Sequence, residues 1–114
     1  VQAVNVAPAS AEARANSQEA TTESIQQGES LYLANCAACH GTEGRGDGPT
    51  AQRTGLALRP LSESAPALTD GALAYRIAVG TVGSGMPGFA GTLSDKDRWD
   101  LVNYLRDAFG AADT

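Results

Sequence analysis

The chain has 114 residues, of which 42% are hydrophobic and only 5% aromatic, so it is long enough for one domain with a modest core. Its 8 Lys and Arg against 13 Asp and Glu give a formal net charge of −5, and Lys96, the only lysine, lies in no basic run. Nucleic-acid binding, which needs clustered cationic side chains, is therefore excluded, and since no apolar run reaches about 18 residues, no membrane-spanning helix is predicted.

Residues 1–22 are rich in Ala, Ser, Gln, Glu and Asn, a composition typical of a tail or linker. Such a tail could tether the domain formed by residues 23–114 to a membrane anchor or to a larger subunit. The alternative is a partly helical arm that lies on the domain, because residues 11–20 include good helix formers.

A first helix is predicted from Thr22 or Ser24 to Asn35. Ser24 as the N-cap, followed three residues later by Gln27, fits a capping box. Gly28 lies in the helix interior, where glycine costs about 1 kcal/mol relative to alanine. Its presence therefore suggests that another helix approaches closely at this point.

The helix is followed directly by Cys36-Ala37-Ala38-Cys39-His40, a C-x-x-C-H motif with the spacing of covalent c-type haem attachment. Each thiol can form a thioether with one haem vinyl group, and the adjacent imidazole can then ligate the iron. A redox dithiol is disfavoured because it belongs in a βαβ setting, and a structural zinc site needs four Cys or His ligands where the chain has three. A chance match with free thiols is the third alternative. The motif favours one haem c, bound by Cys36 and Cys39 and ligated by His40.

Residues 41–61 are predicted to form a loop, because the Gly-rich run 44–49 fits neither a regular helix nor a central strand. A long ordered loop in a small domain is usually functional, and here it would wrap around the haem. Arg59 follows an apolar pair and precedes Pro60, so it could turn inward and bind a haem propionate. The competing candidates for this role are Arg45, Arg53 and Tyr75.

A middle helix is predicted from Asp70 to Val79, with Thr69 or Asp70 as its cap and Gly80 as its end. The loop that follows, residues 80–91, carries Met86, the only methionine. A methionine is more often a core residue than a ligand. A Gly-Met-Pro segment in a Gly-rich loop is a poor place for packing, however, so Met86 is the candidate sixth ligand of the iron.

The last helix begins after Ser94, which with Asp97 forms an acidic variant of the capping box, and ends at Gly110. It carries an apolar stripe formed by Leu101, Val102, Leu105, Ala108 and Phe109. Trp99 on this helix is expected to pack against the N-terminal segment or a loop, with a propionate hydrogen bond as the alternative. Strand signals are absent throughout, so the predicted class is all-α.

From Ser24 to Phe109 the chain resembles the class I cytochromes c, small monohaem electron carriers with His/Met ligation. Gly28 and Tyr32 lie eight and four residues before the first motif cysteine, as in that family, and Leu101-Val102-Asn103-Tyr104-Leu105 is similar to the Leu-x-x-Tyr-Leu segment of its last helix. The resemblance implies a cytochrome c fold, with three or more helices wrapped around one haem and the first and last helices crossing at the glycine.

The resemblance also implies that Pro49 offers its carbonyl to the second ring nitrogen of His40, which would fix the imidazole tautomer. The ring of lysines with which mitochondrial cytochrome c docks its partners is missing here. The chain therefore looks closer to bacterial monohaem cytochromes, or to cytochrome c domains fused to oxidases and reductases.

We expect the protein to transfer single electrons between redox complexes such as an oxidase, a reductase or a quinol-oxidising complex, and not to be an enzyme. Ligation by His40 and Met86 leaves no open position on the iron and raises the reduction potential. The alternative is a haem-based gas or redox sensor in which Met86 is displaced. Haem attachment requires export, so a periplasmic or extracytoplasmic monomer is expected.

Overall fold

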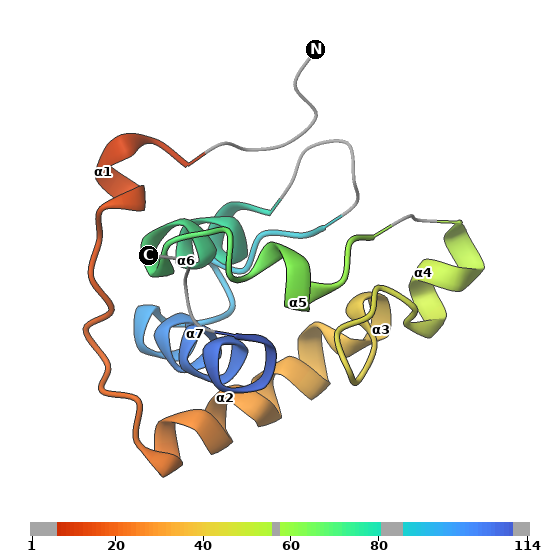
Figure 1. Ribbon diagram of the computed structural model, residues 1–114, viewed down its shortest axis with the longest axis horizontal. Coiled ribbons are helices and arrows are strands. Elements are labelled where there is room, and N and C mark those ends of the chain that lie inside the picture. The colour runs from red at the N-terminus through yellow and green to blue at the C-terminus, as the bar shows by residue number, and fades with distance from the viewer. Residues whose placement is uncertain (1–6, 56–57, 81–85, 111–114) are drawn as a thin grey trace.

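The computed structural model describes residues 7–55, 58–80 and 86–110, and these residues form seven helices (Figure 1). The helices are α1 (Ala9–Glu12), α2 (Thr22–Asn35), α3 (Ala37–His40), α4 (Pro49–Thr54), α5 (Leu61–Ser64), α6 (Asp70–Val79) and α7 (Asp95–Phe109). The predicted all-α class is confirmed. None of the described helices combines the length and the apolar character needed to cross a bilayer.

The longest helices, α2 and α7, cross at Gly28. A Cβ atom built on Gly28 would lie 2.1 Å from the carbonyl oxygen of Asp100 and 2.7 Å from Cβ of Tyr104. Only glycine therefore allows the two backbones to approach this closely. The close approach inferred from Gly28 is confirmed.

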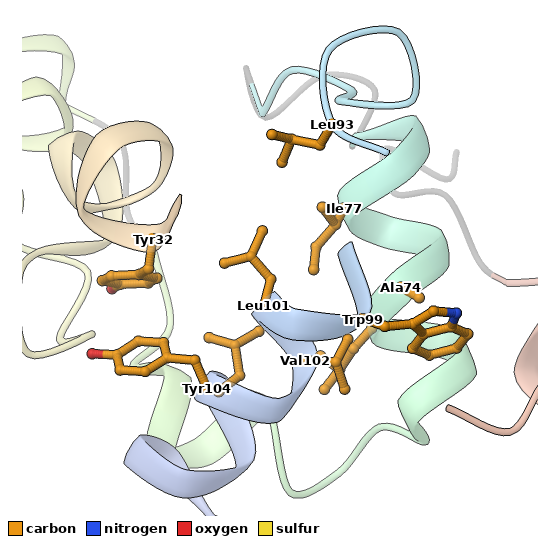
Figure 2. Packing of buried hydrophobic residues seen from close by; sticks show 10 residues of the cluster. Tyr32, Ala74, Ile77, Leu93, Trp99, Leu101, Val102 and Tyr104 are labelled. Atoms are coloured by element: carbon orange, nitrogen blue, oxygen red, sulfur yellow. The ribbon is translucent and has the colours of Figure 1, made fainter. Parts of the chain in front are cut away.

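Three aromatic rings pack beside this crossing. The ring centroids of Tyr32 and Tyr104 are 5.3 Å apart, and Phe109 lies 5.8 Å from Tyr32 and 6.0 Å from Tyr104. Figure 2 shows the two tyrosine rings side by side, with Leu101 projecting from α7 next to them. These contacts fix the relative position of α2 and α7 at the end of α2 that leads into the C-x-x-C-H motif.

The rest of the core joins α7 to α6. Leu73 and Ile77 of α6 are buried and belong to the same cluster as Leu93, Leu101 and Leu105. In Figure 2, Leu93, Ile77 and Leu101 extend toward one another from the loop before α7, from α6 and from α7. This packing gives α6 and α7 a shared apolar face.

Arg106 reinforces the contact between α7 and α6. Its Nε donates to Asp70 Oδ1 at 2.7 Å, and its two Nη atoms donate to the carbonyl oxygens of Ala65 and Leu68, each at 2.6 Å. The three hydrogen bonds hold the connection from α5 to α6 against α7.

The helix caps agree with the sequence at two of three positions. Thr69 caps α6, and Ser94 with Asp97 forms the predicted capping box of α7. The cap of α2 was assigned wrongly to Ser24: the Oγ of Thr21 accepts the hydrogen bond from the Ser24 N–H. Ser24 is instead buried, and its hydroxyl donates to Asp100 Oδ1 at 2.5 Å across the helix crossing.

The prediction of a continuous loop over residues 41–61 is also wrong in part. Pro49 begins α4, because its fixed φ suits the first helical position, and Gly55 ends the helix at a φ of 76°. The second short helix, α5, begins at Leu61. Helices of six and four residues are too short to show a hydrophobic period, so the glycines around them were the stronger signal.

The described part of the N-terminal segment lies on the domain as an arm. In Figure 1 it runs from α1 along one side of the molecule to the start of α2. The Oγ1 of Thr69 donates to the carbonyl oxygen of Glu12, and Asn16 Nδ2 donates to Asn103 Oδ1 at 2.8 Å. These contacts agree with the partly helical arm and not with a detached tail. Residues 1–6 lie outside the described residues, and the domain boundary at residue 22 stays a prediction.

Trp99 packs under this arm, as expected. It is 1% exposed, and the guanidinium carbon of Arg14 lies 5.1 Å from the centre of its ring. The carbonyl oxygen of Trp99 accepts a hydrogen bond from Asn16.

Candidate functional site

The C-x-x-C-H motif forms a single tight turn at the C-terminal end of α2. The Cys36 N–H still donates to the Tyr32 carbonyl at 2.8 Å, and the His40 N–H donates to the Cys36 carbonyl at 2.9 Å in α3. Gly41 ends α3 with a φ of 85°, a conformation that favours glycine. One short segment thus holds Cys36, Cys39 and His40, and this segment directly follows α2, the helix that packs on α7.

The loop after the motif is bonded back onto it. The N–H groups of Gly46 and Gly48 donate to the carbonyl oxygens of His40 and Cys39, at 2.8 and 3.0 Å. The Tyr32 hydroxyl donates to the Gly41 carbonyl at 2.6 Å. These bonds fix the backbone on both sides of His40.

A largely apolar cavity opens beside the motif, and one of its sides is open to solvent. The described residues that line it come from α2, the C-x-x-C-H motif, α5 and the segment after it, α6, α7 and the loop before α7: Tyr32, Cys36, His40, Leu61, Ser64, Leu68, Leu73, Arg76, Ile77, Met86, Leu101 and Leu105. The structure therefore brings together three of the residues singled out in the sequence, Cys36, His40 and Met86.

Burial sets the protonation states of the motif side chains. Burial raises the pKa of the Cys36 thiol to about 11, and the neighbouring Cys39 adds to the shift, so the thiol is neutral near pH 7. Burial lowers the pKa of His40, which favours the neutral imidazole. A neutral imidazole has the free lone pair that a metal ligand needs.

Met86 is held against the end of α6. The Phe89 and Ala90 N–H groups donate to the carbonyl oxygens of Ile77 and Ala78, at 2.9 and 3.0 Å. A Cβ atom on Gly80 would lie 2.4 Å from the Met86 carbonyl oxygen, so the two segments are as close as glycine permits. Gly85, the other neighbour of Met86 in the Gly-Met-Pro segment, lies outside the described residues.

Pro49 is the first residue of α4, and a helical carbonyl points along the helix axis. The His40 Nδ1 atom is buried and has no hydrogen-bond partner among the described residues. The structure therefore does not record the expected bond between His40 and Pro49, and that role of Pro49 stays a prediction.

Arg59 does not line the cavity, contrary to the inward turn expected for it. Its side chain is 71% exposed, and its guanidinium lies 3.8 Å from the Glu63 carboxylate one helical turn later. The ion pair with Glu63 and the open surface favour this outward position. Among its competitors, Arg45 is also on the surface and pairs with Glu43.

Two polar lining residues were missed in the sequence, Ser64 and Arg76. Arg76 lies three residues after Leu73 and next to Ile77, both of which face the cavity. Helical spacing is therefore the signal that could have placed Arg76 on the cavity side of α6. Ser64 had no comparable signal, because α5 is a single turn.

The cavity fits a covalently bound haem. It is largely apolar, and its wall carries the free thiol of Cys36 and the partly buried His40, whose Nδ1 has no partner among the described residues; Cys39, three residues after Cys36, is not among the described lining residues. A methionine thioether, which is a soft neutral ligand, lies on the same cavity. An imidazole nitrogen and a thioether sulfur at the wall of an apolar space are suitable ligands for haem iron.

Comparison with known proteins agrees with this chemistry. Residues 23–105 match the family model described as cytochrome C oxidase, cbb3-type, subunit III. The chain is 35% identical over 81 residues to cytochrome c6 of Bumilleriopsis filiformis, a match that covers 71% of this chain and 87% of that protein.

Two further matches are parts of larger proteins. The cytochrome c subunit of a quinone-dependent alcohol dehydrogenase of Gluconobacter oxydans is 32% identical over 94 residues, 73% of this chain but 18% of that subunit. A chain of a reducing HAO-like protein complex of Kuenenia stuttgartiensis superposes with a TM-score of 0.66 at 32% identity, over 80% of this chain and 46% of that one. The chain thus spans less than half the length of these two relatives.

The family match covers most of the chain, the described helices surround a largely apolar cavity, and Cys36 and His40 of the motif lie at its wall. The chain belongs to the class I monohaem c-type cytochromes, proteins that transfer electrons by means of a covalently bound haem.

Proposed function

We propose that the protein is a one-electron carrier whose haem is bound through Cys36 and Cys39 and ligated by His40 and Met86. The observation that carries the proposal is that Cys36, His40 and Met86 line the same largely apolar cavity. When bound, the haem supplies a one-electron couple between ferric and ferrous iron.

The chain's own residues influence the reduction potential of the haem. His40 and Met86 are neutral ligands, so they favour the ferrous state relative to anionic ligands. The leucines and Ile77 that line the cavity exclude water and lower the local dielectric constant, which disfavours the extra positive charge of ferric iron. A high reduction potential is the expected result.

Two strong ligands leave no iron position for a substrate, which is why we propose a carrier and not an enzyme. Its partners would be redox proteins of the kind named for its relatives, such as a dehydrogenase or an oxidase. An extracytoplasmic location follows from haem attachment to the C-x-x-C-H motif, which takes place after export. We further propose a monomer; a membrane tether at the N-terminal end is compatible with this arrangement.

The test is a redox titration of the haem-loaded protein followed by exposure of the ferrous form to CO. We expect one haem that stays bound after denaturation, a reversible one-electron titration and no spectral change with CO. Attachment through only one of the two cysteines in a Cys36→Ala or Cys39→Ala variant would support the thioether assignment. Rapid CO binding by the unmodified protein would contradict the ligand set and favour a gas sensor in which Met86 is displaced.

A further inference from the structure

Arg76 is the only charged residue among the described residues that line the cavity. It is partly buried, and the remaining lining residues include no Asp or Glu. A guanidinium is always charged near neutral pH. The cavity wall therefore carries a fixed positive charge with no acidic side chain of the described chain beside it.

Arg76 differs in this respect from every other arginine of the described residues. The other arginines have polar partners, which are Asp95 for Arg14, Glu43 for Arg45, Thr50 for Arg53, Glu63 for Arg59, the Leu93 carbonyl for Arg98 and Asp70 for Arg106. The Arg76 guanidinium has no hydrogen bond or ion pair with any residue that the structure describes, although the Arg76 backbone carbonyl accepts from the Gly80 N–H at 2.8 Å.

An unpaired cation beside an apolar space is unfavourable, because burial removes water from the charge and nothing replaces it. The cost disappears if the group that occupies the cavity brings an anion to the guanidinium. Arginine matches a carboxylate well, since its planar fork can donate two parallel hydrogen bonds. Ser64, on α5, lines the same cavity and could donate a third.

We propose that Arg76, assisted by the Ser64 hydroxyl, binds a propionate carboxylate of the haem. The inference rests on the proposed function, because it requires a haem in the cavity. It assigns the propionate to α6 and α5, in place of Arg59, whose guanidinium is on the surface and pairs with Glu63.

The pairing has a consequence for the reduction potential. A propionate bound to Arg76 stays ionised over the neutral pH range, so the electron is not accompanied by a proton. Without the guanidinium, a carboxylate in a low-dielectric site has a raised pKa. It then takes up a proton when the iron is reduced, and the potential falls as the pH rises through that pKa.

Other groups near the cavity are not expected to produce this signature. Burial raises the pKa of Tyr32 well above neutral, and Cys36 and His40 are engaged with the haem under the proposed function. The charged residues of the elements that surround the cavity include several with partners elsewhere, namely Glu63 with Arg59 and Asp70 with Arg106. Glu29 of α2 and Asp107 of α7 are exposed.

The experiment is a measurement of the midpoint potential of the haem-loaded protein from pH 5 to pH 9. We expect a flat profile for the unmodified protein near neutral pH. Arg76→Gln should lower the potential and introduce a pH-dependent segment, and Arg76→Lys should largely restore the flat profile. Arg59→Gln is the matched control, since that side chain is exposed and should leave the profile unchanged.

The outcomes separate this inference from the proposed function. If the unmodified protein binds no haem, both the proposed function and the inference about Arg76 are wrong. If the unmodified protein is a normal one-electron carrier but Arg76→Gln keeps its potential and flat profile, the inference alone fails. If Arg76→Gln does not take up haem, the pH profiles of the unmodified protein and of Ser64→Ala test the inference instead. A midpoint potential of the unmodified protein that already falls steeply with pH near neutrality would overturn the inference. A flat profile of the unmodified protein that becomes pH-dependent in Ser64→Ala would support it.

Discussion

Gly28 lies where the α2 and α7 backbones touch, and the Asp100 carbonyl oxygen occupies the space that a methyl group would need. The obstacle is backbone, which a side-chain rotation cannot move away. The glycine therefore determines how closely α2 approaches α7. Because Cys36 and His40 follow α2 in the chain, Gly28 also influences their position relative to the part of the cavity wall that α7 forms.

Gly28→Ala should destabilise the protein by about 3 kcal/mol, because the cost of overpacking exceeds the gain in helix propensity. The measurement is urea unfolding of the haem-loaded protein. Gly91→Ala is the control, since no atom lies within 4 Å of a Cβ built there. Equal stability of the two variants would show that the helices do not meet at Gly28.

Ser24 is the second residue whose role depends on the crossing. Its hydroxyl donates to the buried carboxylate of Asp100 and accepts from Asn103 Nδ2 at 2.8 Å. Asp100 is 0% exposed, and its other oxygen accepts from Lys96 at 2.7 Å. The network satisfies a carboxylate that would otherwise be buried without enough partners.

Ser24→Ala should cost about 2 kcal/mol of unfolding free energy, because it leaves a buried carboxylate oxygen without its donor. Ser30→Ala, an exposed serine on the same helix, should change the stability by less than about 0.5 kcal/mol. Chemical denaturation of both variants tests the difference. A stability loss of the same size in each would contradict the network.

At the scale of elements, the arm formed by residues 8–19 covers α6 and α7. A Cβ atom on Gly71 would lie 2.1 Å from the Ala11 carbonyl oxygen, so the arm packs directly on α6. Farther along, the arm contacts α7 through Arg14, which pairs with Asp95 at 3.3 Å, and through Asn16. Trp99 is buried beneath these contacts.

Removal of residues 1–18 should expose Trp99 and speed hydrogen exchange at its indole N–H by at least about tenfold, since about 1.4 kcal/mol of protection is a factor of ten. Trp99 is the only tryptophan, so its indole proton gives a single NMR signal. Removal of residues 1–6 alone provides the reference exchange rate. Unchanged protection in the longer truncation would mean that the arm does not cover Trp99 in solution.

The sequence predicted the elements that have a hydrophobic period or a cap, and it failed where these signals are short or ambiguous. The α6 and α7 boundaries and the Gly28 crossing followed from such signals. Ser24 was mistaken for a cap because Thr21, Thr22 and Ser24 are all suitable residues, and only the long-range contact with Asp100 distinguishes them. Arg59 was wrongly expected to turn inward, because the direction of a side chain in a loop depends on neighbours that no local pattern shows, here Glu63. Arg76 was missed although its helical spacing from Leu73 places it on the cavity side of α6.

At the scale of the whole molecule, the core cluster of the described residues borders a largely apolar cavity. Only 5% of the residues are aromatic, and leucines from α5, α6 and α7 face the cavity. Burial of these side chains against a haem would supply apolar contact that the chain alone does not make.

The chain without haem should therefore be largely unfolded. A Cys36→Ser, Cys39→Ser double variant produced without haem should show much weaker far-UV helical dichroism than the haem-loaded protein. The same variant in 4 M urea provides the unfolded reference. Native helicity in the haem-free chain would contradict the view that the cofactor completes the core.

The most direct test of the account is the optical spectrum of the oxidised and reduced protein, recorded beside that of Met86→Ala. The account predicts a weak near-infrared band from sulfur-to-iron charge transfer in the oxidised protein and its loss in the variant. It also predicts that the reduced variant, unlike the unmodified protein, binds CO. A spectrum that the substitution leaves unchanged would show that Met86 does not ligate the iron and would contradict the proposed electron carrier with His40 and Met86 as ligands.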